Sequence, residues 1–97
     1  MFETECNEII HIEFQSTNDF IMPIRMSLYY ALIKAKYPDK KIIQYVIYIG
    51  QEPCYMKNAI EEEDFTYSYR LIDIKNLPCE ELLKSKNPGD IIMAGLC

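Results

Sequence analysis

The sequence predicts a small α/β domain, and three segments carry that prediction. Residues 10–15 alternate apolar and polar side chains, with the period of two that is typical of a strand with one buried face. Residues 22–36 repeat apolar side chains at three- and four-residue steps, which indicates a helix. Residues 42–49 form an apolar run rich in β-branched and aromatic residues, as expected for a strand buried on both faces. This order predicts a mixed sheet with a right-handed parallel β-α-β crossover.

The first predicted strand has an antiparallel partner upstream, in residues 2–6. A two-residue turn at Asn7 and Glu8 would join them as a hairpin, because asparagine tolerates positive φ. In that register Phe2 lies opposite Glu13, and Glu3 and Glu5 point to the apolar face. A one-residue change in the turn would bring Glu3 or Glu5 to the other face, because register decides the side on which every residue lies.

The predicted helix begins near Pro23, which suits a first helical turn, and ends before Pro38. We expect the apolar stripe that faces the core to consist of Met22, Met26, Tyr29, Tyr30 and Ile33. Four further apolar residues widen this stripe: Ile24, Leu28, Ala31 and Leu32.

Beyond the central strand, residues 51–64 form a polar connection and residues 66–74 a further strand. A short helix follows Pro78, and the chain stops inside an apolar segment, 91–96. We expect C-terminal helices here and a longer protein to continue beyond them.

Composition limits the function classes. The 97 residues, 49% of them hydrophobic, suffice for one domain spanning 1–97. A net charge of -5 argues against gripping nucleic acid through an overall positive field. Four scattered cysteines without a CxxC pair indicate free thiols in a reducing environment. The longest apolar run is too short to cross a bilayer, so we expect a cytoplasmic protein without a membrane partner.

Glu13 and Gln15 project from the same side of their predicted strand, just ahead of the helix. A carboxylate and an amide so placed could contribute to one divalent metal site. Arg25 and Tyr29 lie four residues apart and share a helix face.

The ordinary alternative is that Glu13 and Gln15 form the solvated face of an amphipathic strand. His11 could join the metal face or simply pack, and the lysines at 34, 36, 40 and 41 could meet phosphates or complement the helix dipole.

Several segments together resemble the recombination-promoting nuclease family, transposase-like proteins of the PD-(D/E)xK superfamily. They are HIEFQS, MPIRM with the later Tyr29, KYPDKKIIQYVIYIG, YRLIDI, and CEELL with the later NPGD. The likeness runs from His11 to Leu96. It implies a restriction-endonuclease-like fold and Mg²⁺-dependent hydrolysis of DNA.

The resemblance also implies roles for residues. Glu13 takes the acidic place of an E-x-Q variant of the motif, and Gln15 takes the place usually held by lysine. The main-chain carbonyl of Phe14 becomes a second metal ligand beside Glu13, for Mg²⁺ or Mn²⁺. Arg25 and Tyr29 match polar positions of the helix, where Arg25 could contact a phosphate or orient Glu13.

One departure from the family pattern limits the expected activity. The family places an aspartate near the start of the strand before E-x-Q, and residues 1–10 contain none. We therefore expect an N-terminally incomplete member that binds Mg²⁺ weakly and is inactive or weakly active. The alternative is a noncatalytic remnant that serves as an interaction or homodimerisation module by burying open sheet edges.

Overall fold

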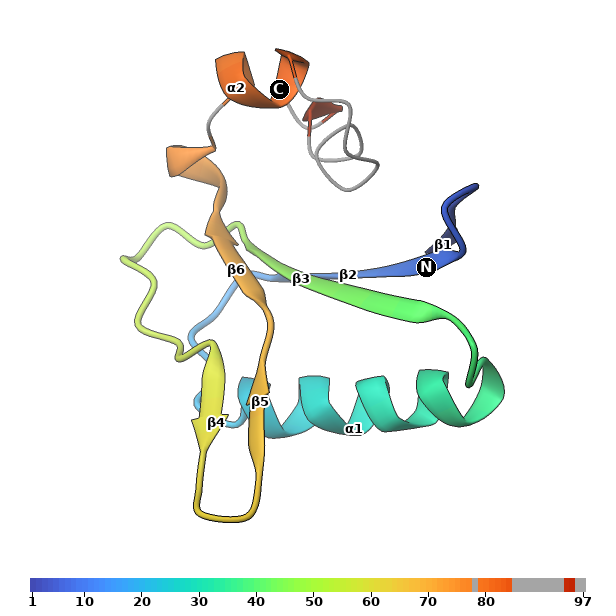
Figure 1. Cartoon of the computed structure of the whole chain (residues 1–97). Helices are drawn as coiled ribbons and strands as arrows, with labels where there is room; N and C mark the ends of the chain where they lie inside the picture. The colour runs from blue at the N-terminus through green and yellow to red at the C-terminus, as the bar shows by residue number, and fades with distance from the viewer. Residues whose placement is uncertain (78, 85–93, 96–97) are drawn as a thin grey trace.

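A four-stranded mixed sheet forms the centre of the molecule (Figure 1). The computed structural model describes residues 1–77, 79–84 and 94–95. The strand order is β1-β2-β3-β6, in which β1 (Phe2–Glu3) runs antiparallel to β2 (Glu8–Gln15). β2, β3 (Lys41–Tyr48) and β6 (Arg70–Asp73) are parallel to one another. The predicted α/β class, with a mixed sheet and an antiparallel pair, is confirmed.

The helix α1 (Met22–Lys36) connects β2 to β3 and has the bounds that the sequence predicts. Figure 1 shows it crossing one face of the sheet. Pro23 occupies the first turn, where its missing N–H needs no partner. At the other end the N–H of Tyr37 donates to the carbonyl of Ile33 at 2.9 Å. The parallel crossover is therefore present, and α1 lies on the face to which the odd-numbered residues of β2 point.

Each face of the sheet has its own apolar cluster. β3 contributes alternate residues to both, which confirms that this strand is buried on two sides. The helix-side cluster contains Met22, Met26, Val46, Tyr48, Met56, Tyr67 and Tyr69. The opposite cluster contains Ile10, Ile43, Tyr45 and Ile47, with Ile72, Ile74 and Leu77 packed against it.

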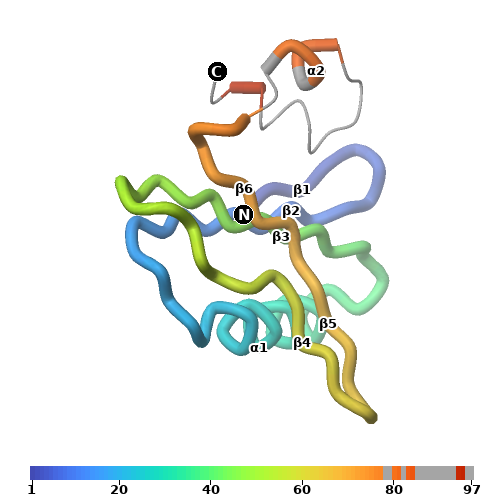
Figure 2. The backbone as a smooth tube through the Cα atoms, turned by 90° about the vertical axis from the view of Figure 1, so that its left-hand side faces the viewer, coloured from blue at the N-terminus to red at the C-terminus, as the bar shows by residue number. Residues whose placement is uncertain are grey.

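The predicted single strand over 66–74 is wrong. β5 (Thr66–Ser68) pairs with β4 (Ala59–Glu61) in a separate antiparallel hairpin, whereas β6 joins β3. The break falls at the buried Tyr69, whose N–H donates to the carbonyl of Asn58 at 3.1 Å. β4 also lies within the predicted polar connection. Figure 2 shows the hairpin extending away from the sheet and past α1.

After β6 the chain forms the 3₁₀ turn η1 (Ile74–Asn76) and the helix α2 (Cys79–Lys84), so the predicted short helix is confirmed. Of the predicted apolar segment 91–96, only residues 94 and 95 belong to the described part of the chain.

The turn between β1 and β2 differs from the predicted one. It contains three residues, Glu5 to Asn7, and Asn7 has a φ of 61°. The N–H of Asn7 donates to the carbonyl of Thr4 at 3.3 Å, as in a type I turn followed by a left-handed residue. Glu3 consequently lies opposite Ile9, and the predicted register is wrong.

The outer residues of α1 overturn part of the predicted core. Ile24, Leu28 and Leu32 are 57–61% exposed, on the side of α1 that faces away from the sheet. Because α1 has apolar side chains on both sides, its sequence does not identify which side is buried. In the described part of the chain, no helix has the length and apolar character needed to span a membrane.

Candidate functional site

Glu13 and Gln15 lie on the α1-facing side of β2. The ring of His11, on the same side of the strand, packs edge-on against Tyr29 of α1, with 5.5 Å between centroids. Oε1 of Glu13 lies 2.9 Å from Nε2 of His11. Nε2 of Gln15 donates to the hydroxyl of Thr17 at 3.1 Å. Two side chains of unlike chemistry thus emerge together from the end of β2, and the Glu13 side chain keeps 36% of its surface exposed.

Arg25 pairs with Asp19, a residue that the sequence did not single out. Nη1 of Arg25 lies 2.7 Å from Oδ2 of Asp19. The Tyr29 hydroxyl and the Asp19 carboxylate together hold the pKa of the Arg25 guanidinium above its usual value. Hydrogen bonds from Arg25 and from the N–H of Ile21 hold the pKa of Asp19 below its usual value. Arg25 and Tyr29 therefore form one polar group with Asp19, joined to Glu13 through His11.

A chain of hydrogen bonds runs through the helix-side core behind Glu13. Gln44 is only 3% exposed, and its Nε2 donates to the carbonyl of Met26 at 3.0 Å and to Nδ1 of His11 at 3.1 Å. A carbonyl can only accept, so the amide group of Gln44 that faces the Met26 carbonyl must be its NH₂, and the amide orientation is fixed. Nδ1 of His11 is then an acceptor, and the ring proton on Nε2 is donated to Glu13.

The far end of this chain is Tyr67 of β5, whose hydroxyl donates to Oε1 of Gln44. Burial raises the pKa of Tyr67 above its usual value, so this hydroxyl remains a donor at neutral pH. Neither Gln44 as the partner of His11 nor Tyr67 as the partner of Gln44 was predicted from the sequence. The available signal was Gln44 itself, the one polar side chain in the apolar run 42–49, because a buried amide requires partners.

Phe14 lies in the part of β2 beyond its pairing with β1. The N–H of Ile49 donates to the carbonyl of Gln15 at 2.9 Å, so Gln15 faces β3. Alternate residues of a parallel strand bond to opposite neighbours, and the carbonyl of Phe14 therefore points away from β3. Among the residues that the structure describes, β1 pairs with β2 only at Ile9 and Ile10. A main-chain oxygen thus lies between Glu13 and Gln15, on an edge of β2 for which the described part of the chain supplies no partner strand.

The oxygen atoms of Glu13, Phe14 and Gln15 are of the type that binds Mg²⁺, but they are fewer than a strong site requires. A carboxylate, an amide oxygen and a carbonyl are the hard ligands that Mg²⁺ takes. Only one of them is charged, and one oxygen of Glu13 already accepts from His11. Over residues 1–77, 79–84 and 94–95 no group of three His, Cys, Asp or Glu side chains could hold a metal.

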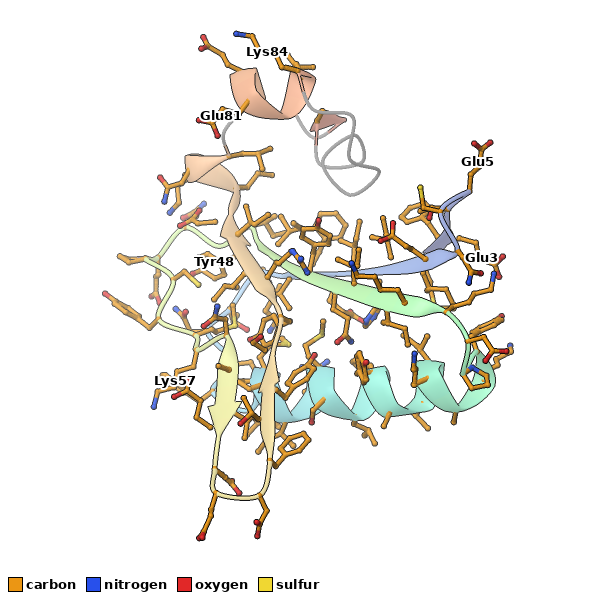
Figure 3. All side chains as sticks on the ribbon, viewed as in Figure 1. Glu3, Glu5, Tyr48, Lys57, Glu81 and Lys84 are labelled. Carbon is orange, nitrogen blue, oxygen red and sulfur yellow. The ribbon has the colours of Figure 1, made fainter. Side chains whose placement is uncertain are left out.

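Glu3 of β1 and Glu5 of the following turn do not complete the site. The observed register places Glu3 on the same face as Glu13, but opposite Ile9, where its carboxylate lies 3.2 Å from Nζ of Lys40. Figure 3 shows Glu3 and Glu5 at the end of the sheet where β2 begins, far from Tyr48, the residue of β3 that pairs with Gln15.

The clustered lysines have local partners. Nζ of Lys34 donates to the carbonyl of Lys40 at 2.7 Å, and Lys41 lies 3.8 Å from Glu8. Lys34 and Lys41, like Lys40 beside Glu3, therefore have partners within the chain.

No protein-family model matches this sequence, and neither a curated protein nor a solved structure matches it. The side chains gathered at the end of β2 are therefore the basis on which a function is inferred.

Proposed function

We propose that the end of β2 is a reduced divalent-metal site that cleaves DNA phosphodiesters slowly, in a restriction-endonuclease-like domain of the nuclease family that the sequence resembles. One observation carries the proposal: Glu13 and Gln15 emerge side by side next to α1, with the outward carbonyl of Phe14 between them. A hairpin, the E-x-Q strand, a covering helix and a parallel strand follow in the order that this resemblance implies.

Each residue has a distinct role in this proposal. Glu13 and the carbonyl of Phe14 would hold Mg²⁺ or Mn²⁺, with low affinity because only one ligand is charged. The bound ion supplies a coordinated water of lowered pKa and offsets charge on the phosphate. Gln15 would orient a phosphate oxygen through its amide, because it lacks the charge of a lysine.

Arg25 would donate its remaining N–H groups to a phosphate while Asp19 fixes the guanidinium in place. Tyr29 contacts His11 and so supports the side chain that orients Glu13.

Nicking of supercoiled plasmid DNA in Mg²⁺ or Mn²⁺ tests the proposal. Glu13→Gln keeps an acceptor for His11 but removes the charge, and we expect it to abolish both nicking and Mn²⁺ binding measured by electron paramagnetic resonance. Glu5→Gln is the matched control, because this exposed carboxylate lies at the other end of β2. Equal nicking by the wild type and Glu13→Gln would contradict the assignment.

A second candidate function is a noncatalytic interaction module. The observation in its favour is that Glu13 and Arg25 are already paired within the chain, with His11 and Asp19 respectively. Absence of nicking at every metal concentration, together with Mn²⁺ binding that does not depend on Glu13, would support this candidate.

A further inference from the structure

The outer face of α1 is apolar along its whole length. Ile21, Ile24, Leu28 and Leu32 are 55–61% exposed, and Ala31 and Ala35 are exposed as well. We call these six residues the α1 seam. Positions 21, 24, 28, 31 and 35 alternate steps of three and four, the spacing of a helix that packs along another helix. Single exposed apolar residues are ordinary, but a continuous row without a charge marks a contact surface.

The β4–β5 hairpin lies beside the N-terminal half of the α1 seam. A shallow hollow there is lined on the helix side by Phe20, Pro23 and Ile24, and on the hairpin side by Ile60 and Phe65. Figures 1 and 2 both show the tip of the hairpin projecting beyond α1. A binding partner that covers the α1 seam would therefore also contact the hairpin.

The two ends of this surface carry opposite charge. The hairpin tip bears four exposed carboxylates, Glu61, Glu62, Glu63 and Asp64, and in the described ranges none of them forms a salt bridge. The last turn of α1 carries Lys34 and Lys36, and Lys36 is exposed. The surface is thus acidic beside the start of the helix and basic at its end.

This distribution selects a second copy of the chain in antiparallel orientation as the occupant. A two-fold axis near Leu28 would place Leu28 against Leu28, Ile24 against Leu32, and Ile21 against Ala35. The same rotation brings Lys36 of each copy to the acidic hairpin tip of the other. A parallel arrangement would place lysine beside lysine and carboxylate beside carboxylate, which is unfavourable.

We propose that two copies of this chain form a two-fold dimer through the α1 seam, with each hairpin lying along the last turn of α1 in its partner. This dimer does not use the sheet edges or the end of β2. The proposal therefore does not require the candidate metal site to be active.

The central test is Leu28→Glu, which places two carboxylates against each other at the two-fold axis. Sedimentation equilibrium should show a wild-type dimer and a monomeric variant, with dimer affinity reduced at least about a hundredfold. Circular dichroism should be unchanged, because the Leu28 side chain is 57% exposed in the monomer. Tyr55→Glu is the matched control, since Tyr55 is 63% exposed and does not line the hollow beside the seam, and it should leave the dimer intact.

Charge reversal tests the antiparallel arrangement. Lys36→Glu should weaken the dimer by roughly fivefold, in keeping with exposed ion pairs formed twice. Adding Glu62→Lys in the same chain should restore it.

The proposal would be overturned if the wild type stayed monomeric at about 100 μM, because its dimer affinity would then be weaker than that of most specific protein pairs. So would a dimer that survives Leu28→Glu. Leu28-dependent binding of monomers to phosphatidylcholine vesicles would also overturn it, and would assign the seam to a lipid surface.

Discussion

At the scale of single residues, Gln44 holds together the polar atoms inside the helix-side core. It satisfies the carbonyl of Met26, Nδ1 of His11 and the hydroxyl of Tyr67. Gln44→Leu keeps the volume and leaves all three without this partner. Because unsatisfied buried groups are expensive, we expect a loss of about 2–4 kcal/mol in the free energy of unfolding, measured with urea.

Gln51→Leu is the control for Gln44→Leu, because Gln51 is exposed and its substitution should change stability by less than about 0.5 kcal/mol. Equal effects of the two substitutions would show that water replaces the amide in the core.

The residues of the candidate site were only partly predictable. The period of two along residues 10–15 suffices to put Glu13 and Gln15 on one face, because it is a local property of a strand. The partner of His11 was not predictable in this way. It depends on the register of β2 against β3, which places His11 beside Gln44, and on a hairpin that the sequence did not reveal. Asp19 was missed because its role depends on how the loop after β2 folds back to Arg25.

At the scale of elements, the β1–β2 turn depends on Asn7. Its φ of 61° lies in the left-handed region, where a Cβ atom is unfavourable and asparagine and glycine are tolerated. Asn7→Ala should lower the free energy of unfolding by about 1 kcal/mol, measured by thermal denaturation. Asn7→Gly should cost less, because it loses only the hydrogen bond from Nδ2 to the carbonyl of Asp39.

The control for the turn is Glu5→Ala in the same three-residue loop, with an expected change under about 0.5 kcal/mol. Equal losses for Asn7→Gly and Asn7→Ala would show that the bond to Asp39, and not the backbone conformation, fixes this turn.

The elements themselves show where sequence patterns are informative. Helix α1 was predicted to the residue because proline positions and apolar steps agree locally. The division of 66–74 into β5 and β6 was not, because both halves have strand-forming residues and the break at Tyr69 follows from its bond to Asn58. The two apolar sides of α1 were likewise equivalent in sequence, and only packing against Val46 and Tyr48 identifies the buried one.

At the scale of the whole molecule, buried tyrosines limit stability at high pH. Burial, with a further contribution from Cys54, raises the pKa of Tyr69 to about 12, whereas the unfolded chain ionises near its ordinary value of 10. Between these two values the unfolded state binds fewer protons, so stability is full below about pH 10 and declines toward pH 12. Tyr67 acts in the same direction.

Urea denaturation at several pH values measures this decline. Tyr69→Phe should remove about 2 kcal/mol of the loss between pH 10 and 12, at about 1.4 kcal/mol per pH unit for one group. Tyr55→Phe, at an exposed position, should leave the slope unchanged. An unaltered slope in Tyr69→Phe would mean that this hydroxyl ionises equally in both states.

The hydrogen bonds that end at Glu13 begin in a strand outside its own sheet. Displacing the hairpin would separate Tyr67 from Gln44 and loosen the amide that positions the imidazole and, through it, the carboxylate. A partner chain that grips the hairpin would consequently restrain the Glu13 side chain from the opposite side of α1. Dimer formation would then increase the affinity of the Glu13 carboxylate for a cation, and cation binding would in turn favour the dimer.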